Sequence, residues 1–198
     1  MKTNTPIFSL IVVGCSTGGL QALRVLLGGL PRGLPLPVAI VQHRATGPAS
    51  GLTKMLGAAS PLPVCEPCDK QKLQPGCVYL APAGYHLLVE ADHFALSTGS
   101  PVANARPSVD VLFESAADAY GPRVIAVVLT GANSDGARGA ARVKACGGHV
   151  IVEDPATAEA RSMPDAALAA TSTDQVLPLA RIAACLSNLC PVTVPLKP

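Results

Sequence analysis

Residues 7–27 read IFSLIVVGCSTGGLQALRVLL and contain the change from strand to helix on which the fold of this chain depends. The first part, Ile7–Val13, is a continuous apolar run, and such runs are typical of strands covered on both faces. After a glycine-rich turn, Leu20, Leu23 and Leu27 recur at the spacing of one helix face. The stretch therefore predicts a strand, a tight turn and a helix in direct succession.

The same alternation continues along the chain. Further continuous apolar runs predict strands at Pro37–Val41, Val124–Leu129 and His149–Val152. Helical patterns lie at Leu20–Leu27, Val109–Tyr120, Ala137–Ala145, Met163–Ala170 and Leu179–Leu189. Because strands that alternate with helices form parallel sheets with right-handed crossovers, the sequence predicts an α/β fold, with a mostly parallel sheet flanked by helices.

Three short apolar segments break this pattern. They are Cys77–Leu80, His86–Glu90 and Phe94–Ser97, and only turn-sized gaps separate them. Glu90–His93, between the last two, has the composition of a hairpin turn. We therefore expect a small antiparallel hairpin beside the parallel sheet.

The composition limits the class of protein. The chain has 198 residues and a formal net charge of +2, with 49% hydrophobic and 14% charged residues. This amount of apolar surface excludes an intrinsically disordered chain. The weak charge and the lack of a long Lys/Arg run argue against a nucleic-acid partner. We expect a single domain over residues 1–198, with its core at about 7–190.

The N-terminal sequence and the number of cysteines indicate where in the cell the protein is located. The apolar run after Met1–Pro6 is too short for a signal peptide, and no stretch reaches the roughly 18 apolar residues of a transmembrane helix. Seven cysteines, an odd number without a repeating framework, favour reduced thiols. The sequence therefore predicts a cytoplasmic protein without membrane insertion.

One CxxC pair raises the question of a metal. Cys65 and Cys68 lack a second pair of ligands at zinc spacing, and the pair does not open a helix after a strand, as redox pairs do. A structural metal is therefore the less favoured alternative to ordinary thiols, and we expect no metal and no cofactor. Cys15, inside the glycine-rich turn, is expected to be a small filler residue.

The glycine-rich turn is the first of three loops that bear chemistry. Gly14–Gly18 fits G-x-S-x-G, the pattern of a nucleophilic serine on a strand-to-helix turn, with Ser16 at its centre. Free N–H groups at the start of the next helix suit an oxyanion. The alternative is a phosphate-binding turn or merely a tight turn, although neither nucleotide fingerprint is present.

The other two loops supply a histidine and an aspartate. His43 follows the strand Pro37–Val41, and Asp135 lies in the loop after Val124–Leu129. His43 suits a general base and Asp135 the carboxylate that orients it. The alternatives are a surface histidine and the N-cap of a helix. The order Ser–His–Asp differs from that of α/β-hydrolases, so an ordinary lipase or esterase of that fold is disfavoured.

Four blocks together resemble one family. They span residues 12–19, 42–43, 106–113 and 129–136, and they are VVGCSTGG, QH, RPSVDVLF and LTGANSDG. In this order and at these gaps they are similar to the CheB family, the chemoreceptor protein-glutamate methylesterases. The resemblance runs from about Ile7 to Leu186.

The resemblance implies a Rossmann-like three-layer domain and a hydrolase that removes methyl groups from glutamate γ-methyl esters of chemoreceptor helices, with glutamine deamidation as a related activity. It implies methylated chemoreceptors and other chemosensory proteins as partners. It makes Ser16 the nucleophile, His43 the general base and Asp135 its orienting carboxylate. Thr17, Gly18 and Ala132 are then expected around the substrate and the oxyanion.

Several positions depart from the family pattern. We expect no receiver domain before the catalytic domain. Ala132-Asn133-Ser134 stands where the familiar enzymes have Met-Gly and a polar residue, and Ala105 replaces a histidine. Within the Arg-Pro-Ser block, Arg106 is expected to pair with a carboxylate and Ser108 to cap the helix from Val109. The alternatives to an esterase are a catalytically silent interaction module in a chemosensory complex and a phosphate-binding protein.

Overall fold

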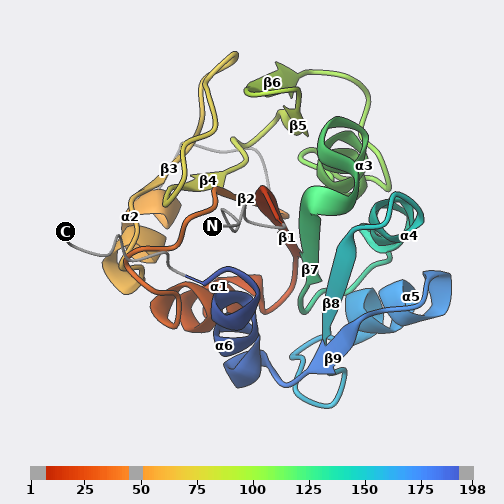
Figure 1. The fold of residues 1–198 in the computed structure, drawn as a ribbon. Coiled ribbons are helices and arrows are strands. Elements are labelled where there is room, and N and C mark those ends of the chain that lie inside the picture. The colour runs from red at the N-terminus through yellow and green to blue at the C-terminus, as the bar shows by residue number, and fades with distance from the viewer. Residues whose placement is uncertain (1–7, 45–50, 192–198) are drawn as a thin grey trace, which may run out of the picture.

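The computed structural model describes residues 8–44 and 51–191 (Figure 1). A seven-stranded sheet forms its centre, and every pairing in that sheet is parallel. In spatial order its strands are β3 (Val64–Cys65), β4 (Val78–Leu80), β2 (Val38–Gln42), β1 (Leu10–Cys15), β7 (Val124–Val128), β8 (His149–Glu153) and β9 (Gln175–Leu177). The predicted α/β class with a mostly parallel sheet is confirmed.

The strand order places a switch point beside β1. From β1 the chain adds β2, β3 and β4 on one side, and it later adds β7, β8 and β9 on the other. In open α/β sheets, functional groups gather outside the carboxyl ends of the strands at such a point. The loops after β1, β2 and β7 are therefore neighbours at one edge of the sheet.

Helices cover both faces of the sheet (Figure 1). Ile11 and Val13 of β1 pack in one core with α1 (Gly19–Gly28), α2 (Leu52–Ala59) and α6 (Leu179–Leu189). Leu10 and Val12 point to the opposite core, with α3 (Val109–Tyr120), α4 (Ala137–Ala145) and α5 (Ser162–Ala170). All four strand residues are fully buried, which at about 1.5–3 kcal/mol per large aliphatic side chain explains why the runs are continuously apolar.

The predicted antiparallel hairpin is confirmed. β5 (His86–Val89) and β6 (Phe94–Ser97) pair antiparallel, and β5 packs against α3. The remaining short segment, Cys77–Leu80, contains β4, which also interrupts the alternation of strands and helices but joins the central sheet, where it pairs parallel with β2. The sequence of a three-residue strand is too short to show which strand it pairs with, and in this sheet β4 pairs at the edge of β2.

The structure also differs from the sequence prediction at the ends of some elements and at the edges of the sheet. The strand expected at Ile7–Val13 is Leu10–Cys15, and Ile7 lies outside the described residues. The edge strands β3 and β9, the helix α2 and a 3-10 turn at Gly121–Arg123 were not predicted. Edge strands of two or three residues are defined by pairing, so their sequences carry little periodicity. The three helices expected at Val109–Tyr120, Ala137–Ala145 and Leu179–Leu189 have those bounds in the structure.

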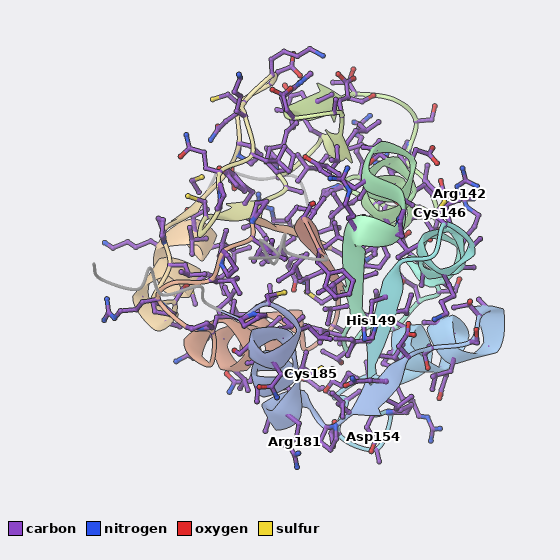
Figure 2. The ribbon with its side chains drawn as sticks, viewed as in Figure 1. Arg142, Cys146, His149, Asp154, Arg181 and Cys185 are labelled. Atoms are coloured by element: carbon purple, nitrogen blue, oxygen red, sulfur yellow. The ribbon has the colours of Figure 1, made fainter. Side chains whose placement is uncertain are left out.

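The described part of the chain contains no helix that is long and apolar enough to cross a membrane. Within residues 8–44 and 51–191, no three His, Cys, Asp or Glu side chains are grouped to hold a metal ion. All seven cysteines are free thiols, and Figure 2 shows two of them, Cys146 directly after the end of α4 and Cys185 in α6.

Candidate active site

Ser16, His43 and Asp135 lie in the loops after three neighbouring strands. Ser16 follows β1, His43 follows β2, and Asp135 lies in the loop after β7. Hydrogen bonds continue beyond the strand ends: the N–H of His43 donates to the carbonyl of Cys15 (3.0 Å), and that of Ser16 to the carbonyl of Thr130 (2.9 Å). The backbone therefore holds the three loops together at one edge of the sheet.

The glycines around the serine are required by the packing of this turn. A Cβ on Gly14 would lie 2.2 Å from Cγ1 of Val109, and a Cβ on Gly19 would lie 2.0 Å from Oε1 of Gln42. Gly18, the N-cap of α1, has a φ of 77°, which only glycine adopts at little cost. Gly14 of the G-x-S-x-G pattern thus lets the nucleophile loop approach α3 closely, and Gly19, just after the pattern, lets the start of α1 approach β2.

Gln42 holds the first two loops together, a role that the sequence did not reveal. Its buried Nε2 donates to the carbonyls of Ser16 and His43, both at 2.9 Å. Its Oε1 accepts from the thiol of Cys15 at 3.1 Å. Burial, followed by the charge of Glu153, raises the pKa of the Cys15 thiol, which therefore remains protonated. Cys15 fills space as expected, and it also fixes the orientation of the Gln42 amide.

His43 and Asp135 form a direct pair. Nε2 of His43 lies 2.7 Å from Oδ2 of Asp135, whose side chain is fully buried. Burial alone would raise the pKa of Asp135, but hydrogen bonds from His43 and from the start of α3 lower it below its ordinary value. An ionised carboxylate can only accept, so the proton of the neutral imidazole sits on Nε2 and Nδ1 keeps its lone pair.

The start of α3 binds the carboxylate of Asp135. The Ser108 hydroxyl donates to Oδ1 at 2.8 Å, the N–H of Val109 to Oδ2 at 2.7 Å and the N–H of Asp110 to Oδ1 at 2.9 Å. Helix N-termini stabilise anions in this way. The interpretation of Asp135 as an N-cap of α4 is wrong, because Gly136 occupies that position. The predicted capping of α3 by Ser108 is confirmed.

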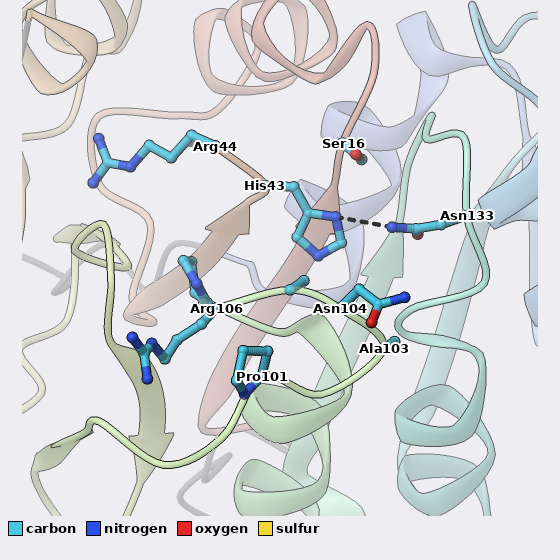
Figure 3. A pocket seen from close by; sticks show the side chains of 10 residues that line it. Ser16, His43, Arg44, Pro101, Ala103, Asn104, Arg106 and Asn133 are labelled. Atoms are coloured by element: carbon cyan, nitrogen blue, oxygen red, sulfur yellow. Dashed lines mark hydrogen bonds between the residues drawn. The ribbon is translucent and has the colours of Figure 1, made fainter. Parts of the chain in front are cut away.

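Asn133 contacts the other nitrogen of the His43 ring (Figure 3). Its Oδ1 accepts the N–H of Asp135 at 3.1 Å, and its Nδ2 lies 3.2 Å from Nδ1 of His43. The N–H of Asp135 requires an oxygen, so the amide must turn its NH₂ group towards Nδ1. This contact agrees with a lone pair on Nδ1, and the sequence contained no signal for it beyond the departure from the family pattern.

A second carboxylate is buried beneath the nucleophile loop. Glu153, at the end of β8, accepts the N–H of Thr130 at 2.8 Å, and the Thr130 hydroxyl donates to the carbonyl of Thr17 at 2.9 Å. Burial raises the pKa of Glu153, although the hydrogen bond from Thr130 opposes this shift. Glu153 therefore supports the backbone of the site without reaching the cavities beside Ser16.

Ser16 lines two cavities. The larger, of about 610 Å³, has Ser16, His43 and Asn133 along one part of its wall and Arg44 and Arg106 along another (Figure 3). The smaller, of about 310 Å³, is lined by Ser16 and Gly18, by residues of α1, and by Gln42 and Glu159.

Three further residues, Thr17, Gly18 and Ala132, were expected around the substrate and the oxyanion. Gly18 lines the smaller cavity. Thr17 and Ala132 are exposed and line neither of these two cavities, and their expected places around the substrate and the oxyanion stay predictions. The carbonyl of Thr17 accepts the hydrogen bond from the Thr130 hydroxyl.

The two arginines of the larger cavity have different partners. Arg44 pairs with Glu66 at 2.5 Å. Arg106 donates to the carbonyls of Thr98 (2.8 Å) and Gly99 (2.9 Å), so the expected pairing with a carboxylate is wrong. Backbone carbonyls leave the positive charge of Arg106 uncompensated at the cavity wall.

Together, these features define a class of protein. A parallel α/β sheet brings a serine, a histidine–aspartate pair and the N-terminus of a helix to one switch point, which is the arrangement of a candidate serine hydrolase site.

The chain belongs to the CheB methylesterase family, whose family model matches residues 11–186. It is similar to the crystal structure of the Thermotoga maritima CheB methylesterase catalytic domain, with a TM-score of 0.88 and 37% identity over 92% of this chain and 98% of that one. The resemblance read from the four sequence blocks is confirmed.

Named relatives agree with this assignment. A Leptospira interrogans relative, provisionally named a protein-glutamate methylesterase/protein-glutamine glutaminase, is 43% identical over 89% of this chain and 92% of its own length. The protein-glutamate methylesterase FrzG of Myxococcus xanthus is 38% identical over 91% of this chain. The chain spans 54% of FrzG and 52% of a 38% identical Thermotoga maritima relative, so it corresponds to about half of these longer proteins.

Proposed function

We propose that this protein is a cytoplasmic protein-glutamate methylesterase that hydrolyses glutamate γ-methyl esters on chemoreceptor helices and releases methanol. The observation that carries the proposal is the pairing of His43 with Asp135 at 2.7 Å, with Ser16 on the wall of the same cavity. Family membership supports the choice of ester.

In the first step, Ser16 attacks the ester carbonyl. As the bond from Oγ to carbon forms, the hydroxyl proton moves to Nδ1 of His43, the ring nitrogen that does not face Asp135. The ionised Asp135 stabilises the resulting imidazolium. The acyl carbon–oxygen bond then breaks, and methanol leaves with the proton from Nδ1.

In the second step, water hydrolyses the acyl-enzyme. His43 accepts a proton from water at Nδ1, the hydroxide attacks the acyl carbon, and Ser16 leaves with that proton. The product is a glutamate carboxylate. With glutamine as substrate, the same steps release ammonia in place of methanol, and we propose this deamidation as a second activity.

The start of α1 supports the oxyanion of both steps. In the described part of the chain, the N–H groups of Thr17 and Gly18 have no hydrogen-bond acceptor. They lie beside Ser16, at the positive end of the α1 dipole. Loss of one such donor typically costs about 3 kcal/mol of transition-state stabilisation.

The surroundings of Ser16 suit a side chain presented by another protein. Ser16 lines two cavities, of about 610 and 310 Å³, which leave room beside it for a polypeptide segment. Arg44, which is paired with Glu66, and Arg106, which donates to backbone carbonyls, line the larger cavity, and no acidic side chain is among the described residues of its wall. An acidic receptor surface beside the ester would therefore be favoured.

Methanol release from a methylated chemoreceptor tests the proposal. We expect release by the wild type and by Ser134→Ala, an exposed control in the neighbouring loop. Ser16→Ala should fold normally, because its side chain makes no hydrogen bond to a described residue, and should lose activity to near background. Retention of more than about a tenth of the activity would disprove the assignment of Ser16 as the nucleophile, because loss of a catalytic serine typically lowers the rate by about 10⁶-fold.

A fluorophosphonate probe separates the remaining outcomes. Labelling of Ser16 without methanol release would mean a hydrolase with a different substrate. Absence of both would favour the silent interaction module.

A further inference from the structure

The lone pair of His43 Nδ1 is the single acceptor that the proposed mechanism needs. Asp135 occupies the other ring nitrogen, so the proton of Ser16 must arrive at Nδ1. In this structure the Asn133 amide, at 3.2 Å, faces that lone pair. Ser16 makes no side-chain hydrogen bond with any described residue. The structure thus holds the base in contact with a group that is not the nucleophile.

The orientation of the Asn133 amide is determined by its other end. Oδ1 accepts the N–H of Asp135 at 3.1 Å. A flipped amide would place NH₂ against that N–H and its oxygen against the lone pair of Nδ1, so both contacts would become repulsive. Asn133 therefore donates to Nδ1 for a local reason, the turn that it forms with Asp135.

We propose that Asn133 is a gating residue: its amide occupies Nδ1 of His43 in the resting protein and must release it before Ser16 can transfer its proton. This inference rests on the proposed function. An sp² nitrogen has one in-plane lone pair, so the Asn133 amide and the Ser16 hydroxyl compete for it.

The cavity explains what releases the base. Asn133 lines the 610 Å³ cavity together with Ser16 and His43. A carbonyl of a peptide segment bound there offers the Asn133 NH₂ group a second acceptor, and the base then becomes available to Ser16. A small ester that leaves this part of the cavity empty offers no such exchange. Asn133 therefore favours substrates carried on a polypeptide over small esters.

Two substitutions separate gating from a purely structural role. Asn133→Gly removes the competing donor, and glycine is the residue that the family pattern has at this position. Asn133→Asp keeps the oxygen that accepts the N–H of Asp135 but replaces the NH₂ donor by an acceptor, which would draw a proton onto Nδ1. Ser134→Ala, exposed in the same loop, is the matched control.

The rate of Ser16 labelling by a fluorophosphonate, without substrate, is the first measurement. We expect Asn133→Gly to label about two- to tenfold faster than wild type, the range for loss of one hydrogen bond. Asn133→Asp should label more slowly, and Ser134→Ala should equal the wild type. Slower labelling of the glycine variant with wild-type labelling of the aspartate variant would indicate a turn-forming role and overturn the gate.

A spectroscopic measurement tests the contact even if the protein is no esterase. In ¹⁵N-labelled wild type, the chemical shift of His43 Nδ1 should be that of an unprotonated nitrogen that accepts a hydrogen bond. In Asn133→Gly the chemical shift should change to that of an unprotonated nitrogen without a hydrogen bond. An unchanged Nδ1 signal in the glycine variant would disprove the contact. Unlabelled Ser16 in every variant, with the expected Nδ1 signals, would refute the proposed function and with it the gate, while the contact itself would stand.

Discussion

Nε2 of His43 lies 2.7 Å from Oδ2 of Asp135, although 92 residues separate them in the chain. The parallel pairing of β2 and β7 on either side of β1 brings the two loops together. Three further donors from the start of α3 complete the shell of this carboxylate. The pair is thus built from three separate parts of the chain, and each part can be tested.

Ser108→Ala should weaken both the helix and the site. The hydroxyl donates to Asp135 at 2.8 Å and caps α3, so we expect the free energy of unfolding to fall by about 1–3 kcal/mol. Methanol release should fall as well, because Asp135 loses a donor that holds it. Urea denaturation measures the first effect. Ser187→Ala, whose hydroxyl bonds only the Ala183 carbonyl, is the control, and equal losses in both variants would contradict the role of Ser108.

Glu153→Gln should alter the pH dependence of stability. Burial raises the pKa of Glu153 above its ordinary 4.5, so the folded state holds a proton that the unfolded state releases. Stability from this group is present below about pH 4.5 and is lost as the pH rises through the folded pKa. We therefore expect the variant to exceed the wild type in unfolding free energy at pH 8 but not at pH 4. A constant difference between pH 4 and pH 8 would refute this.

Gln42→Glu should separate the two loops that Gln42 joins. A carboxylate oxygen would face the carbonyls of Ser16 and His43, which now accept from Nε2 at 2.9 Å. We expect methanol release to fall about tenfold or more, because small displacements of reacting groups are costly. Gln74→Glu, an exposed change of the same charge, should retain activity. Wild-type activity in Gln42→Glu would show that the hydrogen bonds of Gln42 to the two loops are not needed for activity.

Gly131→Ala should displace the nucleophile loop. The new Cβ would lie 1.9 Å from Sδ of Met163 and 3.0 Å from Cβ of Ser16, and such overpacking typically costs about 1–3 kcal/mol. Met163→Ala opens space for the new methyl group. The double variant should therefore lose less stability in thermal unfolding than the two single variants together. If the stability losses of the two single variants simply add up in the double variant, Met163 is not the residue with which the new methyl group collides.

Much of the fold could be predicted because its signals are local. The continuous apolar run in β1 and the helical spacing of α3 follow from side-chain periodicity alone, and the predicted bounds of α3 are those of the structure. β4 could not be placed, because its partner is selected by the free edge of β2 and not by its own three residues.

The candidate site divides in the same way. Ser16, His43 and Asp135 could be selected from the sequence because each follows a strand, and parallel strands end at one edge. The sequence by itself thus determined the sheet, its flanking helices and the residue types at the switch point. Only the tertiary structure decided that Gln42 joins the first two loops, that α3 binds Asp135, and that Asn133 faces the base. Hydrogen bonds form between atoms that are close in space, and no local pattern records which distant residues folding brings together.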